Sequence, residues 1–345
     1  MKKINSSIPV KKLIAPVVFF AFLIILPHFF SKTYYTRVLM EVFYFASLGI
    51  AWNILGGYGR QTCWCAATFF ACGAYTSMLC YLRLGEMSPF ISVFIGMAVA
   101  CVVALIIGLP CFKLNGVFFS IATIACATIF RNLLIIFNEF TGGTLGLAFK
   151  IRTQTSLWKM SYMEDLPYYY IALGMLIIAV IVEIVFVNSK LGYYLQAIRD
   201  DQVAAESLGI RSDRVKMGAL LVCACLLAAT GTVYAFKVGY IDPNVVASHD
   251  MSIRIGIMAI IGGMGTIWGP VVGAFIGIPL QEVANKYFAS VGGGGAGYAM
   301  FGLMIVIIVL FRPAGVISLW EPLVKKVKKL AGKGKEENAM EGAAK

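Results

Sequence analysis

The chain alternates between long apolar runs and short polar intervals. An apolar run of about 20 residues is long enough for an α-helix to cross a bilayer. Ten such segments are predicted, at roughly 13–30, 38–55, 62–82, 90–110, 117–138, 169–188, 217–240, 251–264, 269–290 and 298–312. The eighth is about 14 residues long, short for a complete crossing, so a full span and a re-entrant half-helix both stay open. The pattern predicts an all-α polytopic membrane protein, with a transmembrane domain over 1–318 and a polar tail over 319–345.

The longest polar interval before the tail covers residues 190–216, and its middle is predicted to form a short helix. Asp200 and Asp201 place negative charge in the first turn, where the helix dipole favours it, and Gly209 supplies the left-handed conformation that ends a helix. One side of this helix is expected to carry Ala204, Ala205 and Leu208. A small-residue face outside the bilayer suits close approach by another protein. A capped connector between two spans is the alternative interpretation.

The composition separates the chain from soluble domains. Of its 345 residues, 60% are apolar and 13% are charged, whereas soluble domains are nearer half apolar and a quarter charged. The net charge of +12 raises the question of nucleic-acid binding. The positive residues, however, lie at the chain ends and in the loops, as the topology rules of membrane proteins require. The composition therefore predicts contact with membrane lipid and no binding to nucleic acid.

The distribution of positive charge predicts the orientation. With ten spans, both termini lie on one side, and the loops and ends of that side carry 19 Lys and Arg against eight on the other. The side richer in positive charge is cytoplasmic by the positive-inside rule. The chain is thus expected to have both termini, and the 190–216 interval, in the cytoplasm. No small-residue cleavage site follows the first apolar run, so it is interpreted as an uncleaved span.

Nine cysteines and two histidines raise the question of a metal site. Eight cysteines lie inside apolar runs and the ninth lies at the end of one. Cys63 and Cys65 are two positions apart, so on a helix they would point to nearly opposite faces. Small apolar packing between helices explains these cysteines better than ligation, and no metal site is predicted.

Six stretches carry motifs that occur in a fixed order along the chain. They are Asn53–Tyr75, Lys113–Ala125, Thr141–Leu147, Arg199–Ile210, Gly262–Pro270 and Phe311–Gly315. In this order they resemble permease subunits of bacterial branched-chain amino acid ABC importers, the LivM type. The resemblance covers about residues 50–315. The chain departs from the family's usual residues at Arg60, Cys63, Cys65 and Ala66, which concerns the expected solute more than the fold, and Thr128 stands where the family has Glu.

The stretch at 199–210 of this chain resembles the cytoplasmic coupling helix of that family, which docks on an ATPase. Ala204, Ala205 and Gly209 match its Glu-Ala-Ala-x-x-x-Gly signature, and Val203 occupies the position of the Glu. The resemblance implies an ATPase-coupling role for Arg199, Asp200, Asp201, Val203, Ala204, Ala205, Leu208 and Gly209.

A second set of residues is a candidate for the translocation path. It contains Gly57, Gln61, Cys63, Cys65, Arg131, Gly262, Gly263 and Gly265. Irregular backbone in a hydrophobic region survives only against other protein or a water-lined cavity, and an arginine at membrane depth is a functional candidate by default. The alternatives are a re-entrant packing turn for the glycines and, for Arg131, a structural pair with an acid such as Glu41 or a side chain that reaches the outer interface.

The resemblance implies a non-catalytic translocation subunit of an ATP-driven importer in the bacterial cytoplasmic (inner) membrane. No Gly-x-x-x-x-Gly-Lys-[Ser/Thr] motif occurs in the chain, so ATP and Mg²⁺ are expected in partner subunits and no cofactor is expected in this chain. The implied partners are a homologous second permease, two ABC ATPases and an extracytoplasmic solute-binding protein.

Branched-chain amino acids are the favoured solutes under this resemblance. Urea or short amides, other amino acids, and nucleosides or sugars remain alternatives. In a different class, an ion-coupled secondary transporter would need intramembrane acids, and Glu41, Glu183 and Glu282 are available toward span ends. A membrane enzyme is a further class, but the sequence offers no nucleophile–base pair near its two scattered histidines.

Overall fold

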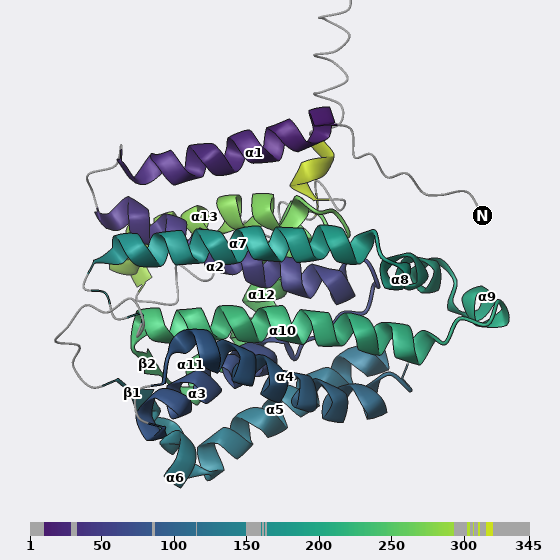
Figure 1. The fold of residues 1–345 in the computed structure, drawn as a ribbon, viewed down its shortest axis with the longest axis horizontal. Coiled ribbons are helices and arrows are strands. Elements are labelled where there is room, and N and C mark those ends of the chain that lie inside the picture. The colour runs from purple at the N-terminus through teal and green to yellow at the C-terminus, as the bar shows by residue number, and fades with distance from the viewer. Residues whose placement is uncertain are drawn as a thin grey trace, which may run out of the picture.

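The computed structural model describes residues 10–28, 33–84, 87–114, 116–149, 160, 162, 164–292, 302–303, 306, 310 and 315–319. Most of the predicted span 298–312 and nearly all of the predicted tail lie outside the described residues. Within them the chain is almost entirely helical, as the apolar pattern predicts (Figure 1). The chain is an all-α polytopic membrane protein.

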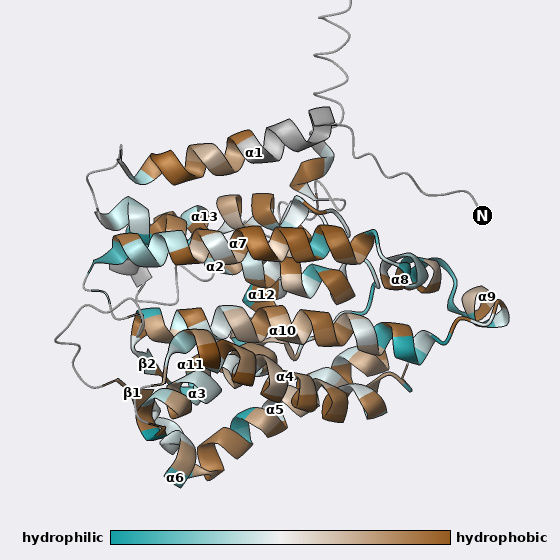
Figure 2. Ribbon diagram, in the orientation of Figure 1, coloured by the Kyte–Doolittle hydropathy of each residue, from teal (hydrophilic) through white to brown (hydrophobic). Residues whose placement is uncertain are grey.

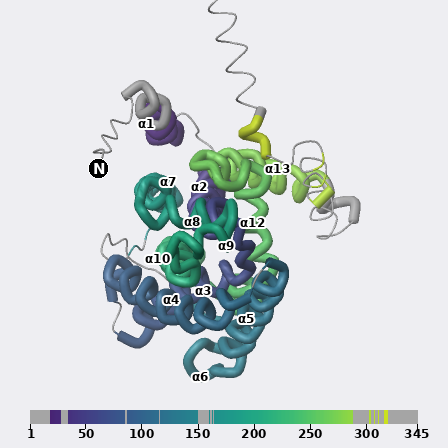
Figure 3. The backbone as a smooth tube through the Cα atoms, turned by 90° about the vertical axis from the view of Figure 1, so that its right-hand side faces the viewer, coloured from purple at the N-terminus to yellow at the C-terminus, as the bar shows by residue number. Residues whose placement is uncertain are grey.

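The centre of the bundle is formed by five of the described helices (Figure 1). They are α2 (Thr33–Gly56), α7 (Asp165–Val187), α10 (Ser212–Val238), α12 (His249–Gly262) and α13 (Gly269–Gly292). Helix α2 packs against all four of the others, which explains why its 18-residue apolar window is 83% buried. Helix α1 (Val10–Ile25), followed by a 3-10 turn (Leu26–His28), lies at one edge of the bundle (Figure 3), where the Tyr169 hydroxyl donates to the carbonyl oxygen of Leu23 at 2.6 Å and the Phe19 ring contacts Phe275.

A second layer lies on the other side of α10 (Figure 3). It contains α3 (Ala66–Arg83), α4 (Pro89–Cys111) and α5 (Val117–Ile136). Helix α3 packs closely on α10 because small residues face each other. A Cβ at Gly73 would overlap the backbone of Ala228, and one at Gly231 would overlap the carbonyl of Phe70. Without a hydrophobic driving force in lipid, close backbone approach of this kind is a main source of helix association.

The outward faces of α4 and α5 are strongly apolar (Figure 2). Only 28% of the apolar window of α4 and 17% of that of α5 are buried within the chain. Exposed side chains there include Phe94, Ile106, Leu109, Val117 and Phe118. A face of this extent suits lipid or another membrane subunit.

Short elements close the two ends of the bundle (Figure 1). One end holds α6 (Asn138–Thr141), a 3-10 turn (Gly143–Leu145), strands β1 (Leu147–Ala148) and β2 (Tyr240–Ile241), and α11 (Pro243–Val246). The two strands pair antiparallel, with Leu147 opposite Ile241. The opposite end holds α8 (Lys190–Asp200) and α9 (Gln202–Ser207). A further 3-10 turn, Val316–Leu319, contacts α12 and α13.

Six described helical stretches are long and apolar enough to cross a membrane, so the predicted count of ten is not confirmed. They are Tyr34–Gly56, Pro89–Cys111, Val117–Ile136, Asp165–Val187, Ser212–Val238 and Pro243–Gly262. The last of these covers residues 251–262 of the predicted short segment 251–264. It joins α11 to α12 across Ala247 and Ser248, and α12 by itself has 14 residues, so a full span and a re-entrant half-helix both stay open for this segment.

The predicted span 62–82 begins differently from the expectation. Residues 60–65 are not helical, and α3 starts only at Ala66. Trp52 Nε1 donates to the carbonyl oxygen of Cys63 at 2.7 Å, so a side chain of α2 satisfies the non-helical backbone. Apolar composition alone does not distinguish a non-helical segment that precedes a helix from the first turn of that helix.

Candidate functional site

The polar interval 190–216 forms two helices instead of one. Helix α8 begins at Lys190, where Ser189 Oγ accepts a hydrogen bond from the backbone N–H of Gly192 at 3.3 Å. It packs on α10 and buries Leu195 and Ile198. Gly59 in the turn after α2 lies against the same helix, since a Cβ there would be 3.1 Å from Leu195 Cδ1. Helix α8 therefore joins the turn after α2 to α10.

The break between α8 and α9 lies at Asp201, which has an extended backbone. Its Oδ1 accepts from the backbone N–H of Ala204 at 3.0 Å and so caps α9. Asp200 is the last residue of α8, where it pairs with Arg199. The prediction that Asp200 opens the short helix was wrong, because the neighbouring aspartate competes for the backbone and starts a new helix.

The predicted end of this helix agrees with the structure. Gly209 has φ +85°, in the left-handed region. The backbone N–H of Gly209 donates to the carbonyl oxygen of Glu206, and that of Ile210 donates to Ala205 at 3.2 Å. Ile210 thus returns toward Ala205, as is usual after a left-handed helix end.

The faces of α9 differ from the prediction. Val203 is 74% exposed and Leu208 83% exposed, whereas Ala205 is only 3% exposed. Ala205 therefore packs against the chain and does not share an outer face with Leu208. Helix α9 has only six residues, so the spacing of its apolar positions does not decide which of its faces packs on the rest of the chain. The outward surface available to a partner carries Val203, Ala204 and Leu208, which we call the α9 outer face.

Side-chain hydrogen bonds that the sequence did not predict hold α9 on the start of α10. Gln202 Nε2 and Ser212 Oγ both donate to Glu206 Oε1, the first at 2.9 Å. Lys216 Nζ donates to Gln202 Oε1 at 2.9 Å. These bonds hold the pKa of Glu206 below its usual value of 4.5, because they stabilise the carboxylate. We call Gln202, Glu206, Ser212 and Lys216 the polar lock. Its only sequence signal was the i, i+4 spacing of Gln202 and Glu206.

The predicted path glycines come together at one junction. Helix α12 ends at Gly262 and Gly263. Gly265 lies against Gly57, since a Cβ added at Gly57 would be 2.5 Å from the backbone nitrogen of Gly265. A Cβ at Gly262 would overlap the carbonyl oxygen of Gly269. Gly263 and Gly265 have φ +127° and +72°. The glycines here permit a tight turn between α12 and α13 against the end of α2. Their role in solute passage stays a prediction.

Asn53 holds this junction to α7. Its Oδ1 accepts from the backbone N–H of Gly265 at 2.8 Å, and its Nδ2 donates to Glu183 Oε1 at 2.8 Å and to the carbonyl oxygen of Thr266 at 3.1 Å. Asn53 and Glu183 are both completely buried. The polar contact therefore connects α2, α7 and the α12–α13 turn. Sequence reasoning matched Asn53 to a motif but did not place its partners.

Cys63 and Cys65 lie deep inside the chain. Their Sγ atoms are 3.1 Å apart, so the expectation that they point to opposite faces was wrong. The cause is the non-helical backbone of residues 60–65, which removes the helical periodicity. Cys101 and Cys225 form a similar pair, 3.2 Å apart between α4 and α10. No group of three or more His, Cys, Asp or Glu in the described part of the chain could hold a metal ion.

Gln61 and Arg131 are the two path candidates with polar side chains, and both are half-buried. Arg131 lies in the second half of α5, and its Nε is buried without a hydrogen-bond partner within the described residues. The suggested pairing with Glu41 is not among the ion pairs of the described chain. The structure does not bring Arg131 together with the glycine junction.

Comparison with known proteins places the chain in a family. Residues 34–310 match the family described as branched-chain amino acid transport system / permease component. The chain belongs to this permease family. It is 25% identical over 315 residues to the high-affinity branched-chain amino acid transport system permease protein LivM of Escherichia coli K12, which covers 84% of this chain and 71% of that protein. LivM of Salmonella typhimurium LT2 is similar at 25% identity over 320 residues.

A more distant relative is the autoinducer 2 import system permease protein LsrC of Yersinia enterocolitica. It is 25% identical over 203 residues, which cover 54% of this chain and 53% of that protein. No solved structure matches the chain. Together with the apolar helices, the family match shows a multi-pass permease component of an ABC-type transporter, as the resemblance implied. The matched relatives are transport subunits.

Proposed function

We propose that this chain is a translocation subunit of an ATP-driven importer and that the α9 outer face docks on a separate ATPase subunit. The observation that carries the proposal is the pair of exposed apolar side chains, Val203 and Leu208, on a helix fixed by the polar lock. Exposed apolar side chains at a bundle end, outside the six apolar spans, suit a protein partner better than lipid.

The contacts of α8 and α9 provide routes from that surface into the spans. Movement of α9 would reach α10 through Glu206 and Ser212, which are hydrogen-bonded. Movement of α8 would reach the turn after α2 through Leu195 and Gly59. From there Asn53 connects α2 to α7 and to the turn between α12 and α13. Closure of the ATPases would thus shift several spans together and alternate access to a central path.

The proposal includes the expected assembly. A homologous second permease would pack on this chain, two ATPases holding ATP and Mg²⁺ would bind on the α9 side, and a solute-binding protein would bind at the opposite end. The end with α9 would be cytoplasmic, with both termini on that side, in a bacterial inner membrane. The excess of positive charge in the sequence supports this orientation.

Branched-chain amino acids are the solutes that we propose, on the basis of the LivM relatives. The likeness to LsrC, whose name gives autoinducer 2 import, makes a polar non-amino-acid solute the second candidate. In either case the solute-binding protein would select much of what is delivered.

Reconstitution tests the proposal. The chain, its partner permease and the ATPases are co-purified, placed in liposomes, and supplied with the solute-binding protein and radiolabelled L-leucine. We expect uptake that needs both ATP and the ATPase subunits. Uptake without ATPases, driven by a proton or sodium gradient, would contradict the proposal and favour an ion-coupled transporter. Uptake of autoinducer 2 in place of leucine would keep the importer and change its solute.

A further inference from the structure

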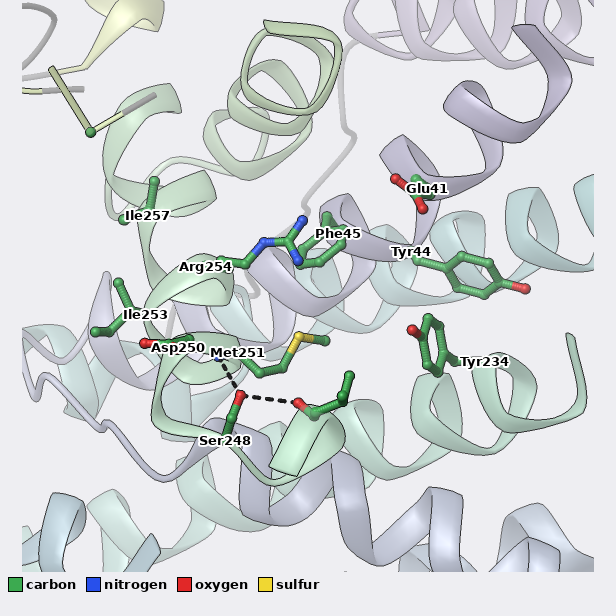
Figure 4. A pocket seen from close by; sticks show the side chains of 12 residues that line it. Glu41, Tyr44, Phe45, Tyr234, Ser248, Asp250, Met251, Ile253, Arg254 and Ile257 are labelled. Atoms are coloured by element: carbon green, nitrogen blue, oxygen red, sulfur yellow. Dashed lines mark hydrogen bonds between the residues drawn. The ribbon is translucent and has the colours of Figure 1, made fainter. Parts of the chain in front are cut away.

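A cavity of about 600 Å³ lies between α2, α10 and α12 (Figure 4). This is within the range of small-molecule sites, about 300–1,000 Å³. Its apolar walls include Phe45, Met251 and Ile257, and its polar side chains include Glu41 and Arg254. Neither the coupling face nor the glycine junction uses these residues.

The cavity lies toward the end of the bundle opposite α9. Tyr234 lines it four residues before the end of α10 at Val238, and Glu41 lines it eight residues after the start of α2 at Thr33. At 1.5 Å per residue these positions are about 6 and 12 Å from the helix ends. In the proposed orientation this is the outer half of the membrane, where a solute-binding protein would release its solute.

Glu41 and Arg254 each bring to the cavity a polar group without a partner in the described chain. Within the described residues the carboxylate of Glu41 has no hydrogen bond or ion pair. Nε of Arg254 is buried without a hydrogen-bond partner in the same part of the chain. Buried polar groups in proteins are nearly always paired, and ionisable groups at membrane depth most often belong to a functional site.

Arg254 is held in position while part of its guanidinium stays free. One Nη donates to Gln281 Oε1 at 2.9 Å, and the guanidinium lies over the Phe45 ring, 4.7 Å from its centroid (Figure 4). A planar fork fixed on one side presents its other N–H groups in a geometry that matches a carboxylate. Glu41 lies within electrostatic range of Glu282, Lys237 and Arg254. The cavity therefore offers an anchored positive group and an unpaired carboxylate beside apolar walls.

We propose that this cavity binds a small zwitterionic amino acid on its way through the permease. Arg254 receives the solute carboxylate, Glu41 receives the ammonium group, and the apolar side chain lies on Phe45 and Met251. A neutral solute would leave Arg254 and Glu41 without a charged partner in the cavity, which is unfavourable. The proposal rests on the proposed function for its choice of an amino acid as solute.

The test uses protection of an introduced cysteine in the purified complex of permeases and ATPases. Ile253→Cys places a thiol in the cavity wall, and its maleimide labelling is compared with that of the parent complex to subtract the native cysteines. We expect saturating L-leucine to slow labelling at least fivefold. 4-Methylpentanoate and 3-methylbutylamine, which each lack one charged group of leucine, should protect much less.

Arg254 and Glu41, the two charged side chains assigned to the solute, are then changed one at a time in the Ile253→Cys protein, and Asp250, which also lines the cavity, is kept. Arg254→Gln and Glu41→Gln should abolish protection, and Arg254→Lys should keep part of it. Arg37→Gln, which changes an arginine on the surface of α2, should leave protection intact. Size-exclusion elution and ATPase activity show that each variant is folded and assembled.

The outcomes separate this proposal from the proposed function. Absence of leucine protection in the Ile253→Cys complex, or protection that survives both Arg254→Gln and Glu41→Gln, would overturn the cavity assignment even if ATP-driven leucine uptake is measured. Protection that depends on Arg254 and Glu41, in a complex whose leucine uptake needs no ATP, would support the cavity and overturn the importer.

Discussion

The glycine junction and helix α9 are both family motifs, yet the chain stabilises them in opposite ways. At the junction, backbone packs directly on backbone with no room for a side chain at Gly262, and the one side chain that bonds to it, Asn53, is completely buried. Helix α9 is held by side-chain hydrogen bonds on one face and leaves Val203 and Leu208 exposed on the other. The difference shows that a shared motif can mark a packing constraint in one place and a partner surface in another.

The largest effect is expected at the junction. Gly262→Ala would push a Cβ into the carbonyl oxygen of Gly269, and neither backbone can move without displacing α12 or α13. We expect a loss of at least about 3 kcal/mol in the free energy of unfolding, and little folded protein in the membrane. The measurement is abundance by immunoblot together with thermal unfolding in detergent.

A matched control is Gly174→Ala in the middle of α7, where nothing lies within 4 Å of the added Cβ. It should be tolerated or stabilise by about 0.5–1 kcal/mol, because alanine is the better helix former. Equal abundance of Gly262→Ala and Gly174→Ala would contradict the close packing at the junction.

The next effect concerns the α9 outer face. The double variant Val203→Asp, Leu208→Asp places charge on two exposed apolar positions. The fold should be unaffected, since neither side chain packs inside the chain. We expect ATPase subunits to be lost on purification and ATP-dependent uptake to fall at least tenfold. Wild-type uptake by this double variant would show that α9 is a plain connector.

Ala205 and Ala204 distinguish the two sides of α9. Ala205→Arg should act through the fold, because a long charged side chain cannot occupy a site that is 3% exposed. We expect a local loss of about 2 kcal/mol or more, seen as faster amide hydrogen exchange in α9. Ala204→Arg, on the exposed side, should leave exchange unchanged and weaken ATPase binding. The reverse pattern would mean that the faces are assigned wrongly.

The smallest effect is expected from the polar lock. The pKa of Glu206 is lowered in the folded chain, so its contribution to stability is fully present above its unfolded pKa, near 4.5, and is lost as the pH falls through the lower folded value. Amide protection of α9 should therefore weaken in acid relative to Glu206→Gln, which removes the titration. Identical pH dependence in the two proteins would show that Glu206 does not contribute.

The topology expected from the sequence remains to be tested by labelling. The predicted orientation places Ser212 in the cytoplasm, beside Glu206 in the polar lock. A single cysteine at Ser207, which is exposed on α9, probes the same side and disturbs the polar lock less than a cysteine at Ser212 would. It should react with an impermeant maleimide only from the cytoplasmic face.

The sequence by itself determined the class of the protein, the family and the positions of most helices. These features depend on local composition, on runs of apolar residues and on motif order. All three can be taken from the sequence without knowledge of the contacts between helices. The cap at Gly209 was also predictable, because a left-handed helix end is a local property of the chain.

Only the tertiary structure decided which face of α9 is buried, which side chains form the polar lock, and where the irregular segment 60–65 lies. It also brought Glu41, Phe45, Tyr234 and Arg254 around one cavity from three helices far apart in the sequence. Each of these features depends on contacts between distant segments. Apolar helices have nearly uniform composition around their circumference, so the sequence carries little information about which side of each helix meets a neighbour.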